Sequence, residues 1–150
     1  MTEPFRRQPY RRIHLNYGWN FMLSELWQTL EFVDGKRACF IRNNSLFLRV
    51  TAYHSDAPDA EMHSIFLYSC NIGAKDEEIP LPTYSVSFSE PLQIISFRRC
   101  LVNGEKKMYC RIIGYWTKND LLIVECFSKF SAEVTLFVYD YYRRFYKDPT

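Results

Sequence analysis

Residues 106–147, KKMYCRIIGYWTKNDLLIVECFSKFSAEVTLFVYDYYRRFYK, decide the fold that the sequence predicts. Polarity alternates through the first part of this stretch, with the period of a half-buried strand. The outward side carries Lys107, Tyr109 and Arg111, and the inward side carries Met108, Cys110, Ile112 and Trp116. A turn at residues 118–120 precedes an apolar run of strand length at residues 121–127. The two strands are therefore predicted to pair as a tight antiparallel hairpin.

The end of the stretch, residues 134–146, is rich in β-branched and aromatic residues, which favour strands. Its polar residues nevertheless recur at helical spacing, and Ser131 has the chemistry of an N-cap. An amphipathic helix is therefore predicted. Its apolar stripe consists of Val134, Phe137, Val138, Tyr141 and Phe145. A final strand over residues 132–141 is the alternative.

The chain before this stretch is predicted to contain one helix and several strands. Apolar residues at helical spacing indicate a short N-terminal helix within residues 19–32. Strands are predicted over residues 38–41, 46–54 and 62–70, whereas residues 90–102 fit either a strand or a helix. The expected core includes Leu48, Val50, Ile112, Leu122 and Val124.

The length of 150 residues and the net charge of +2 limit the possible classes of protein. We expect a single domain at residues 18–150, preceded by a basic, flexible tail at residues 1–17. Four arginines in that tail also suit a basic arm that contacts phosphates or an acidic partner. The net charge is too small to indicate a nucleic-acid-binding protein by itself.

The sequence offers little that would support catalysis. It contains no phosphate-binding glycine motif and no CxxC pair. His54 and His63 flank a loop with Asp56 and Glu61, but no nucleophile or metal-ligand spacing accompanies them, so solvated strand-end residues are expected. We predict a protein without enzymatic activity, metal or cofactor. Five widely spaced cysteines and the lack of a long apolar run predict a soluble, intracellular protein.

The segment CRIIGYWTKNDLLIVECFSKF, followed by VTLFVYDYYRRFYKDP, resembles the end of the small OB-fold subunit of replication protein A and of its counterpart in the CST telomere-capping complex. In those families a strand with a central glycine, a turn, an apolar strand and a C-terminal helix follow one another, and Gly114 stands at the glycine position. The resemblance implies a mainly β protein, an OB-fold-like five-stranded barrel with an N-terminal helix and a C-terminal amphipathic helix.

The same resemblance implies a nuclear, non-catalytic subunit of a single-stranded DNA-binding or telomere-capping complex. Its C-terminal stripe, already given above, would dock on a larger OB-fold subunit, although the stripe could equally cap the chain's own barrel. Single-stranded DNA would contact outward cations and aromatics, namely Arg49, Tyr53, Lys107, Tyr109 and Arg111, although the same residues fit a solvated sheet face. The alternative is a β-sandwich or PH-like protein-protein interaction adaptor with no nucleic-acid role, which requires residues 90–102 to be a full strand.

Overall fold

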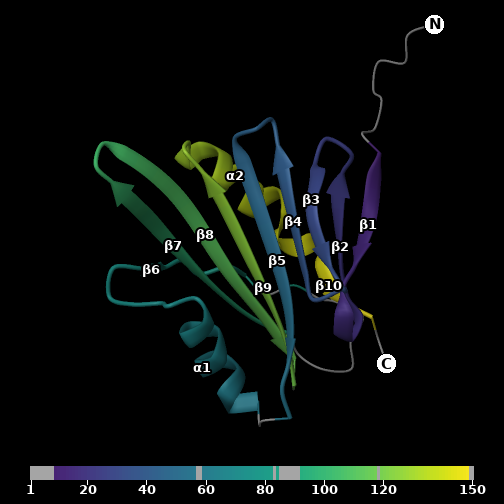
Figure 1. Ribbon diagram of the computed structural model, residues 1–150. Coiled ribbons are helices and arrows are strands. Elements are labelled where there is room, and N and C mark those ends of the chain that lie inside the picture. Colours follow the sequence, from purple (N-terminus) through teal and green to yellow (C-terminus); the bar gives the residue numbers. More distant parts are fainter. Residues whose placement is uncertain (1–8, 57–58, 83, 85–91, 118, 149–150) are drawn as a thin grey trace, which may run out of the picture.

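The computed structural model describes residues 9–56, 59–82, 84, 92–117 and 119–148 (Figure 1). The strands are β1 (Tyr10–His14), β2 (Trp19–Ser24), β3 (Gln28–Val33), β4 (Arg37–Arg42), β5 (Leu46–His54), β6 (Glu77–Glu78), β7 (Gln93–Asn103), β8 (Lys106–Thr117), β9 (Asp120–Ser128) and β10 (Phe145–Lys147). The helices are α1 (Asp59–Ser69) and α2 (Ser131–Tyr141), with short 3-10 turns η1 (Asn16–Gly18) and η2 (Tyr142–Arg144). The mainly β class is therefore confirmed.

Two antiparallel sheets organise these strands. The large sheet has seven strands in the order β3-β4-β5-β9-β8-β7-β6, and the small sheet has three in the order β1-β2-β10. The predicted hairpin is confirmed, because β8 pairs with β9 from Thr117 opposite Asp120 to Tyr109 opposite Ser128. Within the described residues, β3 and β6 have a neighbouring strand on one side only, so the large sheet is open. The expected five-stranded barrel is therefore wrong.

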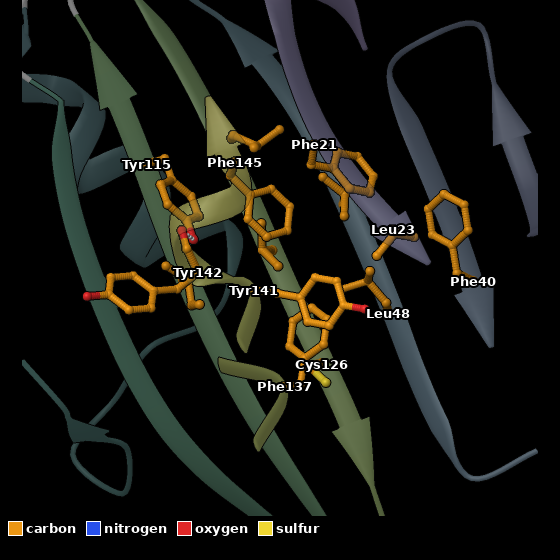
Figure 2. Packing of buried hydrophobic residues seen from close by; sticks show 14 of the residues in the cluster. Phe21, Leu23, Phe40, Leu48, Tyr115, Cys126, Phe137, Tyr141, Tyr142 and Phe145 are labelled. Atoms are coloured by element: carbon orange, nitrogen blue, oxygen red, sulfur yellow. Dashed lines mark hydrogen bonds between the residues drawn. The ribbon is translucent and has the colours of Figure 1, made fainter. Parts of the chain in front are cut away.

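One face of the large sheet, which bears Leu48, Val50 and Ile113, is covered by α2 and the small sheet, and we call it the α2 face. Figure 2 shows aromatic rings from these three elements meeting in one core. Phe21 of β2 stacks on Phe145 of β10 with ring centroids 5.0 Å apart. This face therefore holds the larger core of the molecule, which the small sheet closes from outside.

The opposite face, called the α1 face, bears Phe47, Arg49 and Ile112. Helix α1 packs on it and buries Met62 and Phe66. Figure 1 shows that α1 crosses only one end of the sheet, near β7, β8 and β9. The layers are thus helix, sheet, and helix with small sheet, but the outermost layer on the α1 face is incomplete.

Two predicted elements take the opposite conformation. The expected N-terminal helix is wrong, because residues 19–24 form β2 and residues 28–33 form β3. Trp19, Phe21 and Leu23 alternate along β2 and are buried, which the period of a strand explains. The predicted strand over residues 62–70 belongs largely to α1, where Met62 and Phe66 lie one turn apart on the buried side.

The remaining predictions agree better with the structure. Residues 131–141 form a helix, so the alternative of a final strand is excluded, and residues 93–102 belong to β7. The five residues predicted for the core are all buried. Residues 10–14, predicted as part of the basic tail, form β1 and pair with β2, whereas residues 1–8 lie outside the described residues.

Candidate functional site

The five residues expected to contact DNA do not form one surface. Arg49 of β5 lies opposite Glu125 of β9, which lies opposite Ile112 of β8, so these three residues share the α1 face. Side chains alternate along a strand. Lys107, Tyr109 and Arg111 therefore point to the α2 face, while Arg49 and Tyr53 point to the α1 face. The structure separates the expected cluster by the thickness of the sheet.

The chemistry of Arg49 also differs from that of a free phosphate-binding cation. Its Nε and Nη2 donate hydrogen bonds to the two carboxylate oxygens of Glu125, at 2.9 and 2.8 Å. This bond raises the pKa of Arg49 above its ordinary value. Its guanidinium also lies over the Phe127 ring, 5.6 Å from the centroid. The charge of Arg49 is thus already matched within the protein.

The stripe expected to dock on a partner belongs to the chain's own core. Phe137 is only 3% exposed, stacks on Tyr141 and meets the Trp27 ring edge to face. Phe145 is not helical but lies in β10, where it is fully buried. The remaining stripe residues, Val134 and Val138, are buried as well. The predicted docking helix is therefore wrong, since its apolar side covers the α2 face.

A different apolar surface remains open on the α1 face. It lies over β3, β4, β5 and β9, next to the part that α1 covers, and it is lined by Leu30, Glu31, Cys39, Phe47, Arg49, Met108 and Phe127. We call this set the β3–β5 surface. Leu30 is 57% exposed and Phe47 is 38% exposed. A cavity of about 470 Å³ lies between these side chains.

The edge strand β3 borders this surface. All six of its residues are exposed, including Leu30, Phe32 and Val33. A bulge between Thr29 and Glu31 interrupts its pairing with β4, a feature that limits edge-to-edge strand pairing. Glu31 accepts a hydrogen bond from Arg37 at 2.6 Å. The bulge therefore favours contact through the side chains of this surface over addition of a further strand.

The sequence contains only a weak indication of this surface. Phe47 and Arg49 were predicted to point outward from β5, but single exposed apolar residues are common and identify no site. Leu30 was assigned to a helix that does not exist. The surface unites residues from five strands, and their proximity depends on the strand order β3-β4-β5-β9-β8. No local pattern contains that order.

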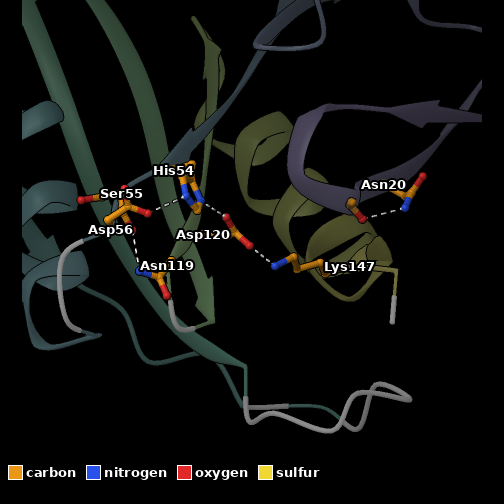
Figure 3. Close-up of polar contacts among 8 residues, drawn as sticks. Asn20, His54, Ser55, Asp56, Asn119, Asp120 and Lys147 are labelled. Carbon is orange, nitrogen blue, oxygen red and sulfur yellow. Dashed lines mark hydrogen bonds and ion pairs between the residues drawn. The ribbon is translucent and has the colours of Figure 1, made fainter. Parts of the chain in front are cut away.

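A polar cluster connects the ends of both sheets (Figure 3). The Nδ1 of His54 lies 2.7 Å from Asp120, and its Nε2 lies 3.3 Å from Asp56. Asp120 also accepts a hydrogen bond from Lys147 of β10. Because both ring nitrogens face carboxylates, the arrangement suits a protonated imidazole and leaves neither nitrogen directed at a substrate. The cluster therefore holds β10 to the large sheet.

His54 should make the stability of the protein depend on pH. Its hydrogen bond to Asp120 raises its pKa above the ordinary value. The stabilisation is thus complete below about pH 6.5, the pKa of an unfolded histidine, and is lost as the pH rises through the folded-state pKa. We expect the urea midpoint to fall between pH 6 and 8.5, and His54→Gln to remove this fall. His63→Gln, which only removes a ring stacked on Trp116, should retain it; an unchanged slope in His54→Gln would contradict the assignment.

Among the described residues, no group of three histidine, cysteine, aspartate or glutamate side chains is arranged to hold a metal ion. Within the same residues, no helix is long and apolar enough to span a membrane.

The sequence matches no known protein-family model and has no significant match among curated proteins. Two solved structures share its fold. One is the crystal structure of the Saccharomyces cerevisiae Ran-binding protein Mog1p, with a TM-score of 0.56 and 8% identity over 94% of this chain and 96% of that one. The other is the solution structure of cyanobacterial PsbP from Synechocystis sp. PCC 6803, with a TM-score of 0.56 and 14% identity over 99% of this chain and 98% of that one.

These likenesses concern the whole chain and identify the fold alone. They overturn the resemblance to the small subunits of replication protein A and CST, since neither solved structure is an OB-fold subunit. The expected role in single-stranded DNA binding or telomere capping, and the expected larger OB-fold partner, depended on that resemblance and are wrong with it. The predicted alternative, an interaction module without a nucleic-acid role, agrees better with the structure.

Proposed function

We propose that this chain is a non-catalytic protein-binding domain, and that the β3–β5 surface is its binding site. One observation carries the proposal. Within the described residues, α1 packs on β8 and β9, while no helix covers the apolar side chains over β3, β4 and β5 on the same face. Contiguous exposed apolar surface of this kind marks interaction sites in soluble proteins.

The partner element that fits this surface best is an amphipathic helix. The same face already accepts a helix, because α1 places Met62 and Phe66, one turn apart, against its neighbouring half. A partner helix lying beside α1 would extend that layer and place apolar side chains between Leu30 and Phe47. This is the helix-in-groove mode of recognition, in which residues one turn apart provide the anchors.

The residues of this surface also have the composition of an interface. Phe47 and Phe127 supply aromatic area, and Met108 supplies an adaptable side chain at the end of the cavity. The ion pair between Arg49 and Glu125 fixes a charged group beside the apolar side chains. Aromatic residues and arginine are enriched at the centre of protein interfaces. The printed description of Mog1p as Ran-binding supports a protein partner for this fold, without identifying the partner of this chain.

Leu30→Lys and Phe47→Lys should each weaken partner binding by about thirtyfold or more. A buried lysine would leave an unpaired charge in the interface, and a residue central to an interface commonly contributes about 2 kcal/mol or more. The full chain, immobilised and exposed to native extract, is expected to retain one dominant protein at near-equal stoichiometry. Retention by each variant is then measured with that purified protein in a titration.

Val102→Lys is the matched control, because Val102 is exposed near the end of β7, away from the β3–β5 surface. It should bind as the unchanged protein does. Circular dichroism and urea midpoints must show that all three variants remain folded. Equal affinity in Leu30→Lys and Phe47→Lys would place the binding site elsewhere, and light scattering that shows a dimer lost in both variants would identify a second copy of this chain as the occupant.

A further inference from the structure

A second cavity lies on the α2 face, between the β7–β8 hairpin and the first turn of α2. Its volume is about 310 Å³, and its polar lining includes Lys75, Glu77, Arg98, Arg111, Ser131 and Thr135. It lies on the opposite side of the large sheet from the β3–β5 surface, since Arg111 and Arg49 point to opposite faces. The features of this cavity are therefore independent of the function proposed above.

The central feature of the cavity is Arg111, which is only 6% exposed. Its Nη2 lies 3.4 Å from the Ser96 hydroxyl, at the limit of a hydrogen bond, and its buried Nε has no hydrogen-bond partner in the part of the chain that the structure describes. Burial lowers the pKa of this guanidinium, as desolvation of a cation does. Buried arginines normally lie against a carboxylate or another anion. Among the described residues, none forms an ion pair with Arg111.

A second arginine lies directly beside it. Arg98 of β7 is opposite Arg111 of β8 in the ladder, so the two side chains share the α2 face. Like charges at directly opposed positions destabilise a sheet unless an anion lies between them. Glu77 accepts a hydrogen bond from Nη2 of Arg98. With Lys75 included, three cations face one carboxylate, which leaves the cavity with a local net charge of +2.

The first turn of α2 adds hydrogen-bond donors on the same side. Its N-cap residue, Phe130, provides no side-chain hydrogen bond to cap the helix, and Ser131 lies at the cavity. The one acidic residue of that turn, Glu133, is engaged elsewhere, by the hydroxyls of Ser45 and Ser128 at 3.0 Å each. The positive end of the helix dipole is thus not neutralised toward the cavity.

We infer that this cavity binds the phosphate group of a small phosphate monoester, with Arg111 and Arg98 as the main ligands. A phosphate monoester carries a charge of about −1.5 to −2 at neutral pH and three strong acceptor oxygens. That charge matches the local excess, and the oxygens match the two guanidiniums and the N–H groups of the helix terminus. The volume is at the lower end of small-molecule sites. Tyr109, which also lines the cavity, provides a ring for the organic part of the ligand.

Titration of the full chain with phenyl phosphate, at an ionic strength kept constant with sodium chloride, tests this inference. Isothermal calorimetry and the backbone NMR signals of Arg98, Arg111 and Ser131 report the binding. Arg111→Gln should weaken it about tenfold or more, because it removes charge-assisted hydrogen bonds in a buried site. Arg98→Gln should weaken it about fivefold, as expected for a more exposed cation. Binding should also weaken below about pH 6, where the phosphate takes up a proton.

Arg37→Gln is the control, because Arg37 is paired with Glu31 on the other side of the sheet. It should leave the affinity for phenyl phosphate unchanged. If Arg111→Gln does not fold, Arg98→Gln still tests the site, since the Arg98 side chain is 58% exposed. Equal affinity in both variants, an equal response to chloride alone, or equally tight binding of benzoate would overturn the inference; the last result would identify a site for carboxylates.

Discussion

Phe137→Glu is expected to unfold the protein. Phe137 lies between α2 and the α2 face, with its ring centroid 5.7 Å from that of Trp27 and 4.9 Å from that of Tyr141. Removing a buried phenyl ring costs about 3–5 kcal/mol, and an unpaired buried carboxylate adds several more. The sum is comparable to the total stability of an ordinary domain, which is about 5–15 kcal/mol. Near-UV circular dichroism and the dispersion of NMR signals would report the loss of the fold.

Leu136→Glu provides the matched control on the neighbouring residue. Leu136 is 61% exposed on the opposite side of α2, so the same carboxylate should change the free energy of unfolding by only about 0.5 kcal/mol. The contrast between adjacent positions separates burial from any general effect of a negative charge on the helix. A folded Phe137→Glu variant with an unchanged urea midpoint would mean that α2 does not pack as described.

This pair of variants also shows what sequence periodicity determines. The stripe through Phe137 and Tyr141 predicted the helix correctly, because the spacing of apolar residues depends only on the local period. The same stripe is compatible with a partner protein or with the chain's own sheet as the covering element. The covering element is the sheet, and it became visible only with the packing of Trp27 and Phe145 against α2. A local pattern therefore predicts the element but not its neighbour.

The mispredicted segments have a related cause. Strands β2 and β3 follow each other closely, and their combined apolar residues imitate a helical stripe although Leu26 and Leu30 are exposed. In α1, the β-favouring residues around Ile65 and Phe66 hid the spacing of Met62 and Phe66. In both places the tertiary structure overrides local preference, which is weak over such short segments.

Alternation in β8 was read correctly, but its orientation was not. The pattern separates Lys107, Tyr109 and Arg111 from Ile112, and the structure agrees that they occupy opposite faces. Both faces of β8 are covered along part of its length, by α1 on one side and by α2 on the other. Polarity then no longer indicates which face meets water. This is why Arg111, expected at the surface, lies buried at the cavity beside α2.

Gly114→Val is expected to destabilise the protein by about 3 kcal/mol, at the upper end of the usual cost of overpacking. An ideal Cβ at Gly114 would lie only 2.7 Å from Cδ1 of Phe66 on α1. The ring cannot easily move aside, since Phe66 is fully buried and lies beside Phe97, with centroids 6.1 Å apart. Valine favours strands and glycine weakens them, so the ordinary effect of this substitution in a strand would have the opposite sign. Urea denaturation would measure the change.

The close approach between Gly114 and Phe66 predicts coupling between the two positions. Phe66→Leu alone should destabilise the protein, since it leaves space above β8, but combined with Gly114→Val it should cost less than the sum of the single changes by roughly 0.5–3 kcal/mol. Gly73→Ala is the control, because no atom lies within 4 Å of its ideal Cβ. Additive effects in the double variant would show that valine acts through the strand itself. A favourable coupling would instead identify Gly114 as the position that lets α1 approach the sheet, and so as a determinant of where the α1 face ends and the open β3–β5 surface begins.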